Sequence, residues 1–333
     1  MERNKTLDIY RAIGLFCIFL AHAMPPAVIM QIRDFDVPLM VFISGLVAPK
    51  SVVSLKKYYI HRSIRLLFPT YLFLLFLFAL YYLLFVFGIV PPLENYTNVM
   101  LNSFLLLENN SIGFVWVVRV FLLMMLITPL LLKARLDKFP NYVMILIAFI
   151  CILLFFQNCC FYSSVAIVDA FNVEYVQYTI GYGLVYIVAL RYNYSKKIER
   201  IVTLLVFCAA ALFFSYNYIE QYGFPIEFYK LYKYPPALPY LCYGLSICLT
   251  LMMVSKSIPL YVVSNKLLCF VGENTFWLYL WHIPFALNVN DYINYWWIRW
   301  LILIVIPLII YSIQYFFVKR FINNLGIAKY LLG

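Results

Sequence analysis

Residues 66–90 decide the fold of this chain, and they read LLFPTYLFLLFLFALYYLLFVFGIV. A helix needs about 20 apolar residues to cross the hydrocarbon core of a bilayer, and this uncharged stretch is long enough to do so. Together with nine further apolar runs it predicts an all-α, polytopic membrane protein with about ten transmembrane helices. The other runs lie near residues 9–30, 37–49, 113–132, 141–161, 174–190, 201–217, 237–254, 268–287 and 295–318.

The composition of the whole chain agrees with a membrane protein. Of the 333 residues, 65% are hydrophobic and only 12% are charged, whereas about 25% are charged in soluble proteins. Too few polar side chains remain to cover a water-facing surface, so the lipid bilayer must be the main solvent. The spans leave no room for a separate soluble domain, and we expect residues 1–333 to form a single transmembrane domain.

The distribution of basic residues predicts the orientation of the spans. If the N-terminus is cytoplasmic and ten spans alternate, most of the 25 Lys and Arg residues fall on the cytoplasmic side, as the positive-inside rule requires. Both termini are then cytoplasmic, and the protein is a multi-pass protein of the plasma membrane. The net charge of +11 reflects this bias and does not indicate nucleic-acid binding. The basic residues left outside are Arg33, Lys230, Lys233 and Arg299.

Two segments depart from simple spans. The run 37–49 has about 13 residues and is short for a span, so we expect a broken or tilted helix that other helices shield from lipid. Residues 51–64 are basic and aromatic, and they predict an amphipathic helix that lies on the cytoplasmic surface.

The first span carries the strongest candidate site. Arg11 and His22 are separated by almost three helical turns, which places them on one face about 16.5 Å apart along the axis. Asp8 precedes Arg11 by three residues and can pair with it at the start of the helix. Imidazole is suited to proton transfer near neutral pH. Both a proton-transfer role for His22 and a hydrogen bond between helices are open.

Arginine and aspartate mark two further places. Arg62 and Arg65 lie one helical turn apart at the cytoplasmic start of the third span, where paired guanidiniums suit phosphate. The positive-inside bias also predicts arginine there. Asp36 precedes the short second span at its outer end, either as a site residue or as a solvated loop acid.

The fourth and ninth spans contain polar residues that a bilayer tolerates poorly. Arg119 follows Trp116 by three residues, and it needs either a counter-charge or a water-filled cavity. His282 lies in the outer half of the ninth span, where a structural hydrogen bond is the alternative to a functional role. The sequence has no Cys/His metal cluster, glycine-rich phosphate loop or nucleophile elbow, and we expect no metal.

Four features in the same order resemble the acyltransferase-3 family of integral membrane acyltransferases. That family carries a basic residue, ten intervening residues and a histidine on its first helix, then an acidic, aromatic and Ser-Gly segment, an Arg-x-x-Arg motif and a C-terminal signature. The matching parts are Arg11 with His22, residues 36–45, Arg62 with Arg65, and residues 265–275 with 279–284. Many members have a glutamate after the tryptophan of the fourth span, whereas Trp116 is followed here by Val117.

The resemblance implies an O-acyltransferase of the branch that modifies polysaccharides. Acetyl-CoA would be the acyl donor, with its phosphates held by Arg11, Arg62 and Arg65 at the cytoplasmic face. His22 would act as general base on a hydroxyl of a glycan or lipid-linked sugar of the cell envelope. Asp36 would be the second catalytic residue and would help to orient the acceptor. The substrate-binding residues would be Arg119, Trp116 and His282.

Two other functions are also compatible with the sequence. A flippase or exporter of lipid-linked saccharide would use the same charged residues to line a path, and it would not cleave a thioester. A polysaccharide polymerase would have a large outer loop rich in Arg and Tyr, whereas the longest outer loop expected here, about 218–236, carries only Lys230 and Lys233 as basic residues.

Overall fold

The structure is a computed structural model that describes residues 4–49, 51–91, 95–108, 111–135, 140–156, 166–322 and 325–332. Within these ranges the chain forms helices and connections without any strand, which confirms the all-α prediction. The first half contains α1 (Lys5–His22), α2 (Ala27–Ile32), α3 (Asp36–Leu46), α4 (Leu55–Val86), α5 (Tyr96–Phe104), α6 (Trp116–Lys133), α7 (Pro140–Phe155) and α9 (Ala166–Phe171).

The second half begins with a π-helical segment that runs directly into a long helix. Its elements are η1 (Asn172–Gln177), α10 (Tyr178–Tyr192), α11 (Lys197–Tyr222), α12 (Phe228–Leu231), α13 (Leu238–Val254), η2 (Ser255–Ser257), α14 (Leu260–Val263), α15 (Lys266–Glu273), α16 (Thr275–Tyr292), α17 (Trp296–Phe321) and α18 (Leu325–Leu332). The connections between helices are mostly short, as expected when hydrophobic spans use most of the chain.

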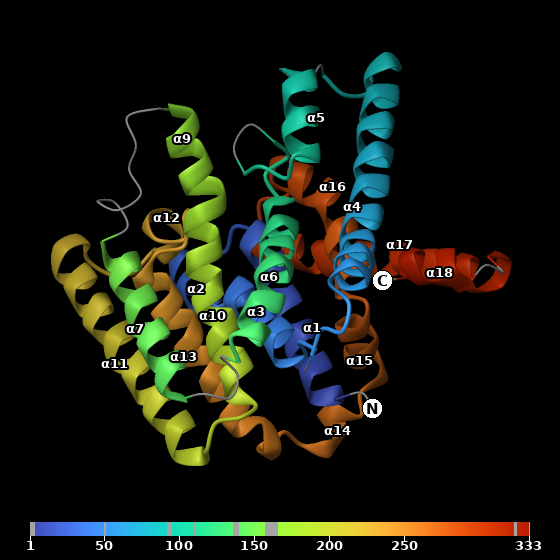
Figure 1. The fold of residues 1–333 in the computed structure, drawn as a ribbon. Coiled ribbons are helices and arrows are strands. Elements are labelled where there is room, and N and C mark those ends of the chain that lie inside the picture. The colour runs from blue at the N-terminus through green and yellow to red at the C-terminus, as the bar shows by residue number, and fades with distance from the viewer. Residues whose placement is uncertain are drawn as a thin grey trace.

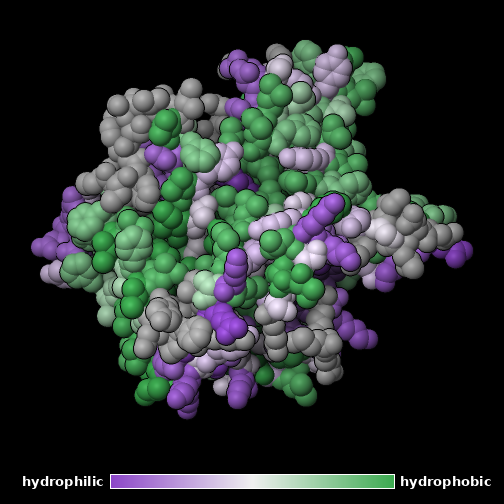
Figure 2. Space-filling model, in the orientation of Figure 1, coloured by the Kyte–Doolittle hydropathy of each residue, from purple (hydrophilic) through white to green (hydrophobic). Residues whose placement is uncertain are grey.

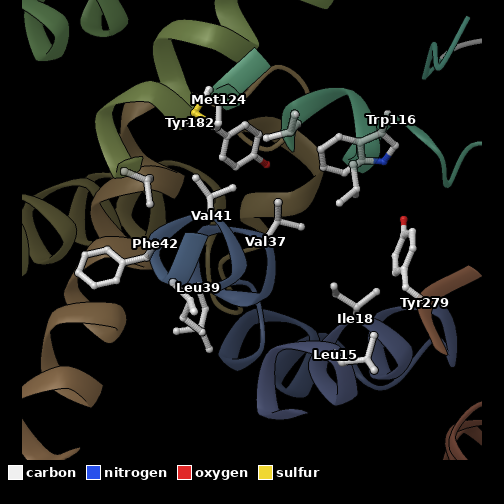
Figure 3. Close-up of a cluster of buried hydrophobic side chains, with 14 of the residues drawn as sticks. Leu15, Ile18, Val37, Leu39, Val41, Phe42, Trp116, Met124, Tyr182 and Tyr279 are labelled. Carbon is white, nitrogen blue, oxygen red and sulfur yellow. The ribbon is translucent and has the colours of Figure 1, made fainter. Parts of the chain in front are cut away.

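The short helix α3 lies at the centre of the bundle (Figure 1), where it packs against α1, α10 and α13. Its backbone comes very close to α10, because a Cβ added at Gly45 would lie 2.9 Å from the carbonyl oxygen of Tyr186. Small residues permit such close packing of helices in membranes. In Figure 3, side chains from α1, α3, α6, α10 and α16 meet in one buried apolar cluster around α3.

The enclosure of α3 explains how so short a helix is tolerated. Of its 11 residues, eight are buried, among them Asp36 at the first position. A segment shorter than the bilayer is stable when protein rather than lipid surrounds it. The expectation of a short helix shielded by its neighbours therefore holds.

Three predicted boundaries are wrong. The run 268–287 is not one helix, because α15 ends at Glu273 and α16 begins at Thr275. The apolar run 9–30 is not one helix, because α1 ends at His22 and Pro25 and Pro26 separate it from α2. Residues 51–64 do not form a separate surface helix either. From Leu55 onward they are the first turns of α4, which continues unbroken through Pro69 to Val86. Pro69 lies in the first turn of the apolar segment rather than before it, and the helix runs through it, so the basic and the apolar part form one continuous helix.

Five of the described helices are long and apolar enough to cross a membrane, namely α4, α6, α11, α13 with η2, and α17. Their outer surfaces carry large apolar side chains, such as Leu212 at 71% exposure. In Figure 2 hydrophobic side chains cover much of the visible face, and hydrophilic ones lie in small groups at its centre and edges, several of them at the lower edge, where Figure 1 places the N-terminus and α14. The count of about ten spans and the cytoplasmic termini remain predictions.

Candidate active site

The first helix positions two of the predicted residues. Asn4 caps α1 by accepting a hydrogen bond from the backbone N–H of Thr6. Arg11 lies one turn after the buried Asp8 and donates to its carboxylate at 2.6 Å. The predicted Asp8–Arg11 pair is therefore present. At the other end His22 is the last residue of the helix, and the Asn290 side chain donates to its carbonyl oxygen at 3.5 Å. One straight helix thus connects the arginine and the histidine.

His22 lies beside His282, which comes from α16. Their ring centroids are 5.3 Å apart, and the ring of Phe114 packs edge-on against His22 at 4.5 Å. His282 is completely buried. Its Nδ1 faces the carbonyl oxygen of Tyr279, and because a carbonyl only accepts, Nδ1 carries the proton and Nε2 is an acceptor. This Nε2 has no hydrogen-bond partner among the described residues.

A buried group of charges surrounds Asp36 at the start of α3. The Asp36 carboxylate pairs with Arg33 at 2.7 Å and with Lys233 at 3.1 Å, and Arg33 also pairs with Asp34 at 3.1 Å. All four side chains are buried, and the rings of Tyr234 and Tyr240 lie near the Lys233 ammonium. The reading of Asp36 as a solvated loop acid is therefore wrong, since it is the anion of a buried ion cluster.

Arg119 has the counter-charge that its place in a span requires. It is buried in α6 and pairs with Glu174 of the π-helical segment η1. The guanidinium also lies 4.8 Å from the ring of Tyr178, whose hydroxyl donates to Glu108. This second polar group adjoins the first through aromatic side chains, because Trp116 contacts the rings of Tyr178, Tyr182 and Tyr234.

A cavity of about 1830 Å³ opens at the end of the bundle that holds the N-terminus. The predicted phosphate ligands Arg11, Arg62 and Arg65 all line it. Its inner wall is apolar and includes Ile18, one helical turn before His22, as well as Tyr279. In Figure 3 Ile18 and Tyr279 lie close to each other beside Leu15.

The structure therefore separates the predicted residues into two sets. Arg11, Arg62 and Arg65 share the cavity, whereas the other candidates lie beyond its lining. Tyr279 belongs to both places, because it lines the cavity and its ring contacts that of His282. The candidates beyond the lining are His22, Asp36, Trp116, Arg119 and His282.

The acyltransferase-3 family model, described as an acyltransferase domain, matches residues 4–323. The chain belongs to the acyltransferase-3 family. The match covers nearly the whole chain and every candidate residue named above, so the bundle is that of a membrane acyltransferase. No curated protein and no solved structure matches the chain.

Sequence reasoning missed several polar residues of this acyltransferase. Arg33 and Lys233 were assigned to outer loops, but they are buried against Asp36, and Glu174 is the partner of Arg119. A signal for the first two was present, because they are basic residues on the predicted outer side, where the positive-inside rule expects few Lys and Arg. Of the other two exceptions, Lys230 pairs with Glu227 and Arg299 donates to the carbonyl oxygen of Ile293.

Proposed function

We propose that the protein transfers an acetyl group from acetyl-CoA to a hydroxyl of a cell-surface polysaccharide or lipid-linked saccharide, with His22 as general base. The observation that carries the proposal is the cavity. Arg11, Arg62 and Arg65 are among the residues that line it, and its apolar inner wall reaches Ile18, one turn before His22 on the same helix. This arrangement suits a ligand with phosphates at one end and a thioester at the other.

The arginines account for the donor end. Arg62 has no carboxylate within ion-pair distance in the described ranges, and its guanidinium lies 5.8 Å from the ring of Tyr58. Guanidiniums bind phosphate oxygens through charge-assisted hydrogen bonds. The pantetheine arm would then run along α1 between Leu15, Ile18 and Met40, all of which line the cavity. The thioester would end beside the pair of histidines.

The proposed chemistry needs one base. The imidazole of His22 accepts the proton of the acceptor hydroxyl while the hydroxyl oxygen attacks the thioester carbonyl carbon. The C–S bond then breaks, the acetyl group stays on the acceptor oxygen as an ester, and the imidazolium returns the proton to the CoA thiolate. General-base catalysis of this kind contributes about 10²- to 10⁴-fold in rate.

The acceptor would occupy the opposite side of the histidines. The buried cluster around Asp36 and the Arg119–Glu174 pair would contact it, and the two groups adjoin each other through aromatic rings. Together with Trp116 these groups offer charges, hydroxyl groups and flat apolar faces, which suit a sugar. The Nε2 of His282 provides an acceptor for a hydroxyl hydrogen next to His22.

Release of the CoA thiol by the purified protein tests the proposal. With acetyl-CoA and a glycan acceptor, we expect the parent to release thiol and to form O-acetyl ester, visible by NMR. His22→Ala should lower the rate at least 100-fold while CoA binding persists. His61→Ala is the matched control, because His61 is exposed on α4 and should leave the rate unchanged.

The same assay separates the enzyme from a carrier of lipid-linked saccharide. A flippase or exporter has no step that consumes a thioester. If the parent protein releases no CoA thiol with any of the acceptors, the result would favour a transport function. A His22→Ala rate within tenfold of the parent would remove His22 as the base and leave the acyltransferase assignment untouched.

A further inference from the structure

The cavity holds a second set of basic residues that the donor arginines do not include. Lys197 and Arg200 of α11 and Lys256 of η2 also line it, so six basic side chains of the described residues line the cavity. In the described part of the chain, Glu273 is the single carboxylate among the lining residues. So strong an excess of positive charge indicates a ligand with more than one anionic group.

The two sets come from different sides of the bundle. Arg62 and Arg65 belong to α4, and Arg11 belongs to α1. In Figure 1 the helix α11 lies across α3 and α10 from α4. Lys197 and Arg200 therefore lie on another side of the cavity from Arg62 and Arg65, and Lys256 of η2 lines the same cavity.

Contacts at the corner between α10 and α11 orient Arg200 without neutralising it. Its guanidinium lies 4.3 Å from the ring of Tyr192, and its Nε donates to the Ser195 hydroxyl at 3.2 Å. The nearby Arg191 differs, because Glu199 pairs with it at 2.7 Å. No carboxylate in the described ranges lies within ion-pair distance of Arg200. A guanidinium held by an aromatic face retains its charge and its outer N–H groups for an anion.

We propose that Arg200, together with Lys197 and Lys256, binds the 3′-phosphate of CoA. The inference rests on the proposed donor and extends it to a specific phosphate. The order of groups along CoA decides the assignment, since the diphosphate lies between the thioester and the ribose that carries the 3′-phosphate. Arg11 lies on the same helix as His22, so we assign Arg11, with Arg62 and Arg65, to the diphosphate, which is closer to the thioester than the 3′-phosphate is. The exposed Lys197 and Lys256 suit the ribose end, which is farthest from the thioester.

Calorimetry on the full-length protein in a zwitterionic detergent tests this assignment with CoA and 3′-dephospho-CoA. We expect the parent to bind CoA about 10- to 100-fold more tightly, because a phosphate contact to a charged donor is worth that much. Arg200→Gln should abolish this preference by weakening CoA binding alone. Arg62→Gln should weaken the binding of both CoA and 3′-dephospho-CoA, so that the preference for CoA remains. Lys196→Gln is the matched control, since Lys196 adjoins Lys197 but does not line the cavity.

The steady-state rates give a second readout. At saturating acetyl-CoA, Arg200→Gln should keep the parental kcat while KM for acetyl-CoA rises, and adenosine 3′,5′-bisphosphate should inhibit the parent but not this variant. If Arg200→Gln retains the full preference for CoA, the 3′-phosphate assignment is overturned and lipid phosphate becomes the alternative ligand. Failure of the parent to bind either ligand would instead overturn the proposed donor.

Discussion

At the residue scale, the polar side chains beyond the cavity are arranged so that almost every buried charge has a counter-charge. Asp36 has Arg33 and Lys233, and Arg119 has Glu174. Charges left unpaired in a low-dielectric interior cost several kcal/mol each. The pairing stabilises the bundle, and it also holds polar groups in place around the two histidines. His282 differs from these residues, since its Nε2 has no partner in the described ranges.

The unpartnered nitrogen of His282 leads to a prediction. Phenylalanine keeps the ring packing against Phe19, whose centroid is 4.8 Å away, but it removes Nε2. We expect His282→Phe to lower the rate of acyl transfer about tenfold through loss of one hydrogen bond to the acceptor, with CoA affinity unchanged. His282→Gln retains an acceptor oxygen and should recover part of the rate. Parental turnover in the Phe variant would show that Nε2 takes no part in the reaction.

At the scale of elements, α1 is the helix on which the site depends. It carries Arg11 at the cavity and His22 at its far end, and α3, α15, α16 and α17 all pack against it. The contact with α15 is very close, because a Cβ added at Gly272 would overlap the carbonyl oxygen of Asp8. Asp8 in turn holds Arg11. A change at this crossing should therefore affect both stability and the donor site.

Gly272→Ala tests the crossing of α1 and α15. The added methyl group meets backbone atoms that cannot rotate away, so the two helices must separate, at a cost of about 1–3 kcal/mol. We expect a lower midpoint of thermal unfolding in detergent and weaker CoA binding. Gly183→Ala is the matched control on α10, since its added Cβ would have its nearest neighbour, Ile127 Cδ1, at 3.7 Å. Equal unfolding midpoints for the two variants would contradict the close crossing.

At the scale of the whole molecule, the bundle has two different ends. The basic cavity opens at the end that holds the N-terminus, α14 and the α10–α11 connection, and α5 and α9 lie at the opposite end (Figure 1). The positive-inside rule predicts that the first end is cytoplasmic. A donor that enters from the cytoplasm and an acceptor that enters from outside would then meet near His22 without either crossing the membrane.

Reporter fusions test this orientation across α11. Ser195 lies just before this helix and Gly223 just after it. We expect fluorescent protein fused after Ser195 to fluoresce and alkaline phosphatase fused there to be inactive. The reverse should hold after Gly223, because alkaline phosphatase is active only outside the cytoplasm. Matching signals at both positions would mean that α11 does not cross the membrane.

Local features of the sequence were enough to predict the class of the fold and the arginines Arg11, Arg62 and Arg65 of the cavity. Run length and the absence of charge act locally, so an apolar stretch such as residues 66–90 specifies a membrane helix wherever it lies in the chain. The spacing of Arg62 and Arg65, and that of Arg11 and His22, likewise depends only on helix geometry. These residues were therefore identifiable, and the three arginines do share one cavity.

Which distant residues meet depends on how the helices pack in the folded protein. Lys233 reaches Asp36 across 197 positions of sequence, Glu174 reaches Arg119 from another helix, and His282 lies beside His22 from the opposite end of the chain. Hydropathy indicates that a segment lies in the membrane, but it does not indicate which helix packs against that segment. The reason is that the lipid-facing and protein-facing sides of a membrane helix are equally apolar. Pairings such as Lys233 with Asp36 arise from helix packing, and helix packing is a property of the folded bundle alone.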